Sequence, residues 1–248
     1  MSKPVHPPGL TIPPGADELP SEDGVPFETN RHRLEMNLLC DALDRHLASR
    51  RPDYFVGGNM FFYFSLLQTR KNDFRGPDVF VALGVEHRDR KSWVMWEEDG
   101  KAPDVIIELT SESTAEEDHG TKRHVYARLH VPEYFIYDPL TGALEGYQLD
   151  IARGDYRPAT PTAHGRLASL ALGLELGPWD GTYRGFSGPW LRWFHPSGEP
   201  VLLAEEAEVE ERRLREEERR LREEERRLRE EAERKLAEMI AELERHRG

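Results

Sequence analysis

Cysteine is almost absent from this sequence, and that absence already limits what the protein can be. Among 248 residues only Cys40 is a cysteine, so the chain forms no internal disulfide and no zinc site built from several cysteines. Such chains are typical of reducing compartments. No apolar run approaches the roughly 20 residues that span a bilayer, and the N-terminus lacks the basic and apolar segments of a signal peptide. We therefore expect a soluble cytoplasmic protein with no membrane segment.

The sequence also lacks an excess of positive charge. It has 34 lysines and arginines against 47 aspartates and glutamates, which gives a formal net charge of −13 at pH 7. Residues 201–248 hold 17 acidic and 13 basic side chains, so the residues before them carry a net charge of −9. Affinity for nucleic acid comes largely from neutralised phosphates. Any contact with nucleic acid must therefore depend on a local basic surface and on bound cations.

Composition divides the chain into three parts. Residues 1–26 contain seven prolines and few apolar side chains; such a segment buries too little surface to offset its ordering entropy, so we predict a flexible Pro-rich arm. Residues 27–200 have the mixed pattern of a folded domain. Residues 201–248 repeat the heptad EERRLRE, which predicts a charged helix with glutamate–arginine pairs four residues apart.

The heptad of the tail places Leu214, Leu221 and Leu228 in one row. A coiled coil needs a second apolar residue in each heptad, and glutamates occupy those places until apolar residues become denser from Leu236 onward. Two alternatives therefore stay open. The tail is either a coiled coil that joins copies of the chain into a homo-oligomer, or a solitary solvated helix.

Residues 29–49 predict the first helix of the central part. Thr29 or Asn30 can cap its start. Glu35 lies beside the apolar face, where it could join a cluster of carboxylates. The apolar side chains recur at three- and four-residue steps, and they are Met36, Leu39, Cys40, Leu43 and Leu47.

Apolar runs predict the strands that follow. Residues 54–65 form a long strand candidate with a bulge or bend at Gly57 and Gly58, and an acid, Asp78, opens a shorter strand. Residues 88–100 predict a connecting loop or a short helix. Beyond residue 138 the pattern predicts a hairpin and further short strands, at residues 144–149, around Tyr156, at 172–176 and at 190–194.

The most informative stretch is residues 103–138, which predicts a strand, a turn, a helix and a second strand. Glu108 lies where the first strand ends, and the helix carries Lys122 and Tyr126. A carboxylate at a strand end with a lysine beyond the loop suits metal-assisted chemistry on an anionic substrate. Tyr126 lies one turn beyond Lys122, where it packs or forms a hydrogen bond nearby.

Two Pro-Asp-Val segments compete to supply a partner for Glu108. Asp104 is four residues away on the same strand, so the two Cα atoms lie roughly 13 Å apart. That is too far for one magnesium ion, whose oxygen ligands lie at about 2.1 Å. Asp78 on a neighbouring strand can converge with Glu108, and a backbone carbonyl such as that of Leu109 would complete the site. We assign Asp104 to capping of the turn before its strand.

Each candidate also has an ordinary structural interpretation. A single glutamate at a strand end is usually solvated or capping, and Lys122 taken singly is equally common. His32 and His124 lack the spacing of helical metal ligands, so we interpret both as surface or structural residues. Only the joint pattern of Asp78, Glu108 and Lys122 favours a catalytic site over these structural interpretations.

The order of these motifs resembles a known family. The segments ETNRHRLEMNLL, VGGNMFFYFS, GPDVFV, PDVIIELTSEST and VPEYFIYDP, with the helix that carries Lys122, are similar to the Uma-two family of restriction-endonuclease-like proteins in the PD-(D/E)XK nuclease superfamily. The resemblance covers roughly residues 27–195. It implies an α/β fold with an α-β-β-β-α-β core, in which helices flank a mixed sheet, with extra β-hairpins and a long C-terminal helix.

The resemblance implies an endonuclease that uses Mg²⁺, or Mn²⁺, to hydrolyse phosphodiester bonds of DNA. Asp78 takes the Pro-Asp position and Glu108 the acidic position two residues before the usual lysine. Thr110 replaces that lysine, so Lys122 would supply the ammonium group, and Glu35 would add a carboxylate from the first helix. The acidic body and Thr110 favour an alternative, a catalytically inactive nuclease-fold interaction module assembled through the C-terminal helix.

Overall fold

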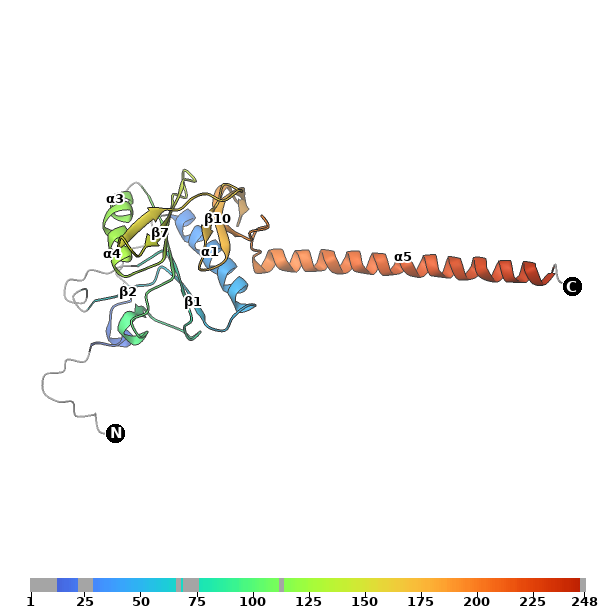
Figure 1. Ribbon diagram of the computed structural model, residues 1–248, viewed down its shortest axis with the longest axis horizontal. Coiled ribbons are helices and arrows are strands. Elements are labelled where there is room, and N and C mark those ends of the chain that lie inside the picture. The colour runs from blue at the N-terminus through green and yellow to red at the C-terminus, as the bar shows by residue number, and fades with distance from the viewer. Residues whose placement is uncertain (1–12, 22–28, 66–67, 69–75, 112–113, 246–248) are drawn as a thin grey trace, which may run out of the picture. The chain divides into compact units, whose positions relative to one another are not determined.

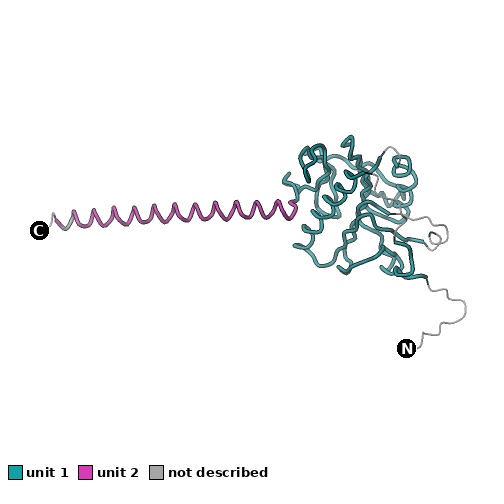
Figure 2. The backbone as a smooth tube through the Cα atoms, turned by 180° about the vertical axis from the view of Figure 1, so that it is seen from behind, with its two compact units in different colours: residues 1–201 teal, residues 202–248 magenta. Residues whose placement is uncertain are grey.

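The computed structural model divides the chain into two compact units, residues 1–201 and residues 202–248 (Figure 2). The first unit is a mixed α/β body, and the second is a single long helix. The residues that the structure describes are 13–21, 29–65, 68, 76–111 and 114–245.

A six-stranded mixed sheet forms the centre of the body (Figure 1). Its strand order is β1-β3-β5-β6-β7-β8. Strands β5 and β6 are parallel, whereas the other neighbouring pairs are antiparallel. The strands are β1 (Tyr54–Gly58), β3 (Val79–Leu83), β5 (Val105–Leu109), β6 (Glu133–Tyr137), β7 (Leu144–Asp150) and β8 (Asp155–Pro158). The α/β class, the mixed sheet and the hairpin of β7 and β8 are confirmed.

A helical crossover joins the parallel strands β5 and β6, as a parallel pair requires. It consists of α3 (Ala115–Glu117), the π-helical turn η3 (Asp118–Lys122) and α4 (Arg123–Arg128). Tyr126 of α4 is buried in the core against apolar side chains of the sheet that include Ile106. A π-helical turn is rare and occurs often at functional sites. The crossover therefore places the π-helical turn η3 and helix α4 beside β5.

Helix α1 (Asn30–Ala48) is capped as predicted, because Thr29 Oγ1 accepts a hydrogen bond of 3.1 Å from the amide of His32. Leu39 and Leu43 are completely buried on its inner face. The helix contacts β1, β3 and β5 and also reaches β11 (Phe186–Phe194). Its contacts therefore extend from the six-stranded sheet to a second sheet, which contains β11.

The long strand predicted over residues 54–65 is wrong, because the chain leaves the main sheet after β1. Asn59 has a positive φ of 45°, and the next strand, β2 (Phe62–Tyr63), pairs in parallel with β4 (Trp93–Val94). Gly57 is part of regular β1, where a Cβ atom would collide with the ring of Phe80. The glycine therefore marks a close approach of side chains and not the bend that we expected there.

The short strands predicted near residues 172–176 and 190–194 belong to a much longer hairpin. Strand β10 (Leu174–Tyr183) has ten residues and β11 (Phe186–Phe194) has nine, and they pair along their whole length. With β9 (Leu167–Ser169) they form a three-stranded sheet in the order β11-β10-β9. A Cβ atom at Gly181 would meet the ring of Trp179. The glycine thus makes room for a large side chain and does not end the strand.

The structure of residues 13–21 shows that this part of the predicted flexible arm is folded. They form a short 3-10 helix, η1 (Ala16–Glu18), and Leu19 is 4% exposed in a cluster with aromatic side chains. Trp96 Nε1 donates a hydrogen bond of 2.9 Å to the carbonyl of Pro14. These partners come from distant parts of the sequence, so composition could not reveal them. The other residues of the predicted arm lie outside the described part of the chain.

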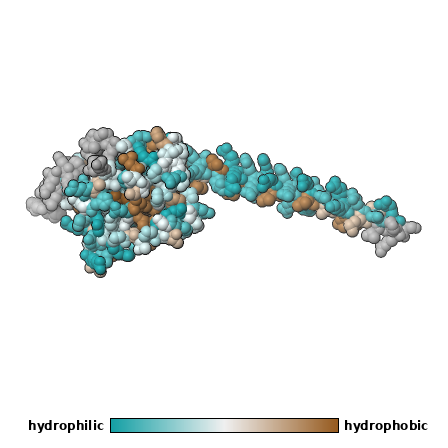
Figure 3. Space-filling view, turned by 90° about the horizontal axis from the view of Figure 1, so that it is seen from above, coloured by the Kyte–Doolittle hydropathy of each residue, from teal (hydrophilic) through white to brown (hydrophobic). Residues whose placement is uncertain are grey.

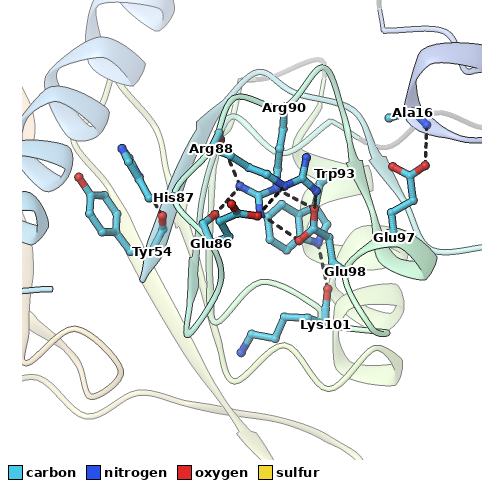
Figure 4. Close-up of polar contacts among 10 residues, drawn as sticks. All are labelled: Ala16, Tyr54, Glu86, His87, Arg88, Arg90, Trp93, Glu97, Glu98 and Lys101. Atoms are coloured by element: carbon cyan, nitrogen blue, oxygen red, sulfur yellow. Dashed lines mark hydrogen bonds and ion pairs between the residues drawn. The ribbon is translucent and has the colours of Figure 1, made fainter. Parts of the chain in front are cut away.

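The segment predicted as a loop or short helix, residues 88–100, contains β4 and the 3-10 helix η2 (Met95–Glu97). Arg88 and Arg90 both pair with Glu98, at 2.8 and 2.7 Å (Figure 4). Arg90 is buried and its guanidinium also lies over the ring of Trp93. The charged side chains of this segment thus stabilise the fold of the segment itself.

The second unit is the helix α5 (Ala204–Arg245) of 42 residues. Leu214, Leu221 and Leu228 are between 52% and 55% exposed, and Figure 3 shows separate apolar patches along a mostly hydrophilic helix. Predicted ion pairs are present, such as Arg215 with Glu211 at 2.6 Å. Across the described residues, no helix combines the length and apolar character needed to cross a membrane.

Candidate active site

The register of β3 and β5 brings the two predicted carboxylates together. Val79 lies opposite Ile107 in this antiparallel pair, so Asp78 just before β3 meets the end of β5. Asp78 Oδ2 accepts a hydrogen bond of 2.7 Å from the amide of Leu109. Asp78 thus contacts the residue after Glu108, and its charge acts on the Glu108 carboxylate.

Glu108 lies fully buried at the end of β5, with a partner on each carboxylate oxygen. Lys122 Nζ lies 2.9 Å from Oε2, and the Tyr126 hydroxyl donates to Oε1 at 2.8 Å. Burial raises the pKa of Glu108, the Lys122 ammonium opposes that rise, and the charge of Asp78 adds to it. The predicted trio of Asp78, Glu108 and Lys122 thus forms one electrostatic unit.

Asp118 is a member of this cluster that the sequence analysis missed. Its Oδ1 lies 2.7 Å from Lys122 Nζ, and the side chain is 1% exposed. The π-helical turn η3 contains both residues, and the Tyr134 hydroxyl donates to the backbone carbonyl of Asp118 at 2.9 Å. Burial by itself lowers the pKa of Lys122, but the charges of Glu108 and Asp118 raise it overall. The four-residue spacing of Asp118 and Lys122 was the signal that could have indicated the pair.

His32 is the second missed member. Its Nε2 lies 2.7 Å from Asp78 Oδ1, and the residue is 8% exposed. Of the two alternatives given for these histidines, His32 is a structural residue and His124 is a surface residue. His32 lies four residues before Met36, which places it on the predicted inner face of α1. That position was the only sequence signal for its contact.

Glu35 occupies a different place from the one predicted. Its Oε1 accepts a hydrogen bond of 3.0 Å from the amide of Leu191 in β11, and its Oε2 has no partner among the described residues. Burial raises the pKa of Glu35 to about 8, and the Leu191 amide and Arg31 oppose that rise. Its contacts thus connect α1 to β11, and His32 is the α1 residue that contacts the cluster.

Thr110 follows Glu108 on the same face of the chain, at the position where the resemblance led us to expect a lysine. It is 8% exposed, and its Oγ1 has no partner among the described residues. The ammonium group beside Glu108 comes from Lys122. Asp104 lies apart from the site, because its Oδ2 accepts from the amide of Leu83 and its Oδ1 pairs with Lys101.

The oxygen donors of Asp78 and Glu108 suit a hard divalent cation. Magnesium is usually bound by one or two carboxylates together with water, and each carboxylate oxygen retains a lone pair after one hydrogen bond. The orphaned hydroxyl of Thr110 adds a further oxygen on the Glu108 face. Within the described ranges, no group of three or more His, Cys, Asp or Glu side chains is arranged to hold a metal ion. Two carboxylates together with water are a donor set that Mg²⁺ or Mn²⁺ accepts.

Comparison with known proteins places this chain in a family. A sequence model of the Uma2 family, described as "Putative restriction endonuclease", matches residues 23–182. A crystal structure from Anabaena variabilis, titled as a "putative nuclease belonging to DUF820", is 14% identical with a TM-score of 0.42, and the alignment covers 64% of this chain and 91% of that one. No curated protein matches the chain. Because the matched segment is well over half of the sequence and contains the whole cluster, the chain belongs to the Uma2 family of restriction-endonuclease-like proteins.

Proposed function

We propose that this protein is a metal-dependent endonuclease that hydrolyses phosphodiester bonds of DNA. The observation that carries the proposal is the buried Glu108 carboxylate, which lies beside Asp78 and contacts the ammonium group of Lys122 at 2.9 Å. Membership of the Uma2 family supports a nuclease and a nucleic-acid substrate. The metal, the kind of nucleic acid and the roles of the residues are our proposal.

In this proposal Asp78 and Glu108 hold Mg²⁺, or Mn²⁺, and the backbone carbonyl of Leu109 completes the protein ligands. The bound ion would polarise a phosphate oxygen and lower the pKa of a bound water. Lys122 would stabilise the negative charge that develops on the phosphate in the transition state. Tyr126 holds the Oε1 atom of Glu108 and so fixes the direction of that carboxylate.

The charge of the cluster supports metal dependence. Asp78, Glu108 and Asp118 supply three carboxyl groups, and Lys122 supplies one ammonium group. The fully ionised cluster carries an excess of negative charge, which repels a phosphodiester at close range. A divalent cation removes that repulsion. We therefore expect the substrate to bind productively only when the cation is present.

A pocket of about 480 Å³ beside the start of α1 is our candidate for the local basic surface that an acidic body requires, because two arginines and one aspartate, Asp41, line it. Arg33 and Arg184 line it, and Phe186 at its edge is 53% exposed. Arg33 directly follows His32 in the sequence, and its direction on α1 differs from that of His32 by about 100°. We assign this pocket to contacts with the phosphate backbone that flanks the cleaved bond.

The test is cleavage of plasmid and single-stranded DNA with Mg²⁺, Mn²⁺ or EDTA, with Glu108→Ala as the matched inactive variant. We expect cleavage by the wild type with either cation, and none with EDTA or in the variant. Equal cleavage by Glu108→Ala would point to a contaminating nuclease and contradict the proposed site. No cleavage under any of these conditions would favour the non-catalytic module.

The non-catalytic module remains the second candidate because of two observations. Thr110 cannot carry the charge of the usual lysine, and the leucines of α5 leave a row of half-exposed apolar side chains. We propose that such a module would assemble as a homo-oligomer through α5. Light scattering of the intact chain and of a chain without α5 tests this assembly.

A further inference from the structure

Among the described residues, helix α1 touches the candidate metal site through one side chain, and the proposed function gives that side chain no role. We propose that His32 is a positioning residue that fixes the Asp78 carboxylate in the orientation needed to bind a divalent cation. The inference rests on the proposed function, because it concerns the same metal site. Its basis is the contact of 2.7 Å between His32 Nε2 and Asp78 Oδ1.

The two oxygens of Asp78 are held from opposite parts of the fold. His32 on α1 holds Oδ1, whereas the amide of Leu109 on β5 holds Oδ2 at 2.7 Å. An ionised carboxylate only accepts hydrogen bonds, so Nε2 of His32 is the donor. Asp78 lies just before β3, and its side chain is 15% exposed. Without the His32 contact, the Leu109 amide is the one hydrogen-bond partner among the described residues that restrains that side chain against rotation toward water.

His32 is itself fixed before it meets Asp78. Its amide donates to the capping Thr29 Oγ1 at 3.1 Å, and its side chain is 10% exposed. Leu39 and Leu43 on the same face of α1 are completely buried and anchor the helix. The imidazole is therefore presented by a rigid element, as a group that orients a metal ligand must be.

Residues that orient metal ligands contribute measurably to metal affinity. Their loss typically weakens metal affinity by about 10–100-fold. The expected effect of His32→Ala is a loss of Mn²⁺ affinity in this range, measured by isothermal titration calorimetry on the full chain. His32→Gln keeps an N–H donor near the position of Nε2, so we expect it to recover most of the affinity.

His46 provides a matched control on the same helix. It is 6% exposed, and its ring lies 5.4 Å from the ring of His195, centroid to centroid. His46→Ala therefore removes a buried histidine from α1 without touching Asp78. We expect it to lower the melting temperature but to leave the Mn²⁺ affinity unchanged.

The outcomes separate this inference from the proposed function. Equal Mn²⁺ affinity in wild type and His32→Ala, or an equal loss in His46→Ala, would overturn the role of His32 while the metal site stands. A wild type that binds no Mn²⁺ would overturn both. If His32→Ala does not fold, His32→Met replaces it, because Met fills the volume without a donor, and the comparison with His32→Gln decides the question.

Discussion

The substitution Lys122→Met tests the chemistry of the site most directly. It keeps the apolar stem of the side chain and removes the ammonium group, which lies 2.9 Å from Glu108 and 2.7 Å from Asp118. Because Thr110 cannot supply a cation, we expect this change to remove the charge that stabilises the transition state. Losing one such group typically costs about 10²–10³ in rate.

The same substitution also affects stability. It leaves Asp118 and Glu108 buried without their shared cation, and breaking a buried ion pair costs about 3–5 kcal/mol. The pKa of Glu108, already raised by burial, rises further when Lys122 is absent. A carboxyl group with a raised folded-state pKa favours the folded protein at low pH and loses that contribution as the pH rises. The melting temperature of Lys122→Met should therefore fall with increasing pH more steeply than that of the wild type.

A double variant separates the two effects. Lys122→Met with Asp118→Asn removes one buried negative charge together with the positive one, so we expect much of the lost stability to return. Cleavage should stay low, because no ammonium group has been restored. The assay is single-turnover cleavage in Mg²⁺ or Mn²⁺, with melting curves for each variant at pH 5, 7 and 9.

Two results would refute this reasoning. Cleavage by Lys122→Met at the wild-type rate would show that the catalytic cation lies elsewhere. Recovery of cleavage together with stability in the double variant would show that Lys122 acts only as a structural counter-ion. Poor rescue by Lys122→Arg is also expected, since a planar guanidinium cannot replace a compact ammonium group.

Three further predictions concern other parts of the chain. Burial raises the pKa of Glu35 from 4.5 to about 8, so the contribution of this group to stability is lost as the pH rises between these values. Glu35→Gln should therefore raise the melting temperature more at pH 8 than at pH 4. An equal shift at both pH values would contradict the claim that burial raises this pKa. Arg33→Gln should weaken DNA binding and reduce the slope of log affinity against log salt by about 1, whereas the exposed control Arg157→Gln should cause a smaller change. Truncation after Val201 should leave the body folded by circular dichroism, since the row of leucines on α5 is exposed, and an unfolded product would refute the division into two units.

The sequence alone was sufficient for the features that depend on local pattern. The cap at Thr29 and the helix after it follow from residue preferences and spacing, and so does the strand–helix–strand unit around Glu108. The pairing of Asp78 with Glu108 also followed from the sequence. Two acids at the ends of adjacent antiparallel strands meet if the strands are neighbours, and the register places Val79 opposite Ile107. Pattern and short-range geometry were enough in these cases.

Only the tertiary structure decided which buried polar side chains contact one another. His32 and Glu35 are three residues apart, so their directions on a helix differ by only roughly 60°. An apolar stripe more than about 100° wide cannot say which of them faces Asp78. The packing of α1 against two sheets settles this, with His32 on Asp78 and Glu35 on the Leu191 amide. The site depends on how a helix is rotated against its sheets, and that rotation is fixed by contacts between residues far apart in the sequence.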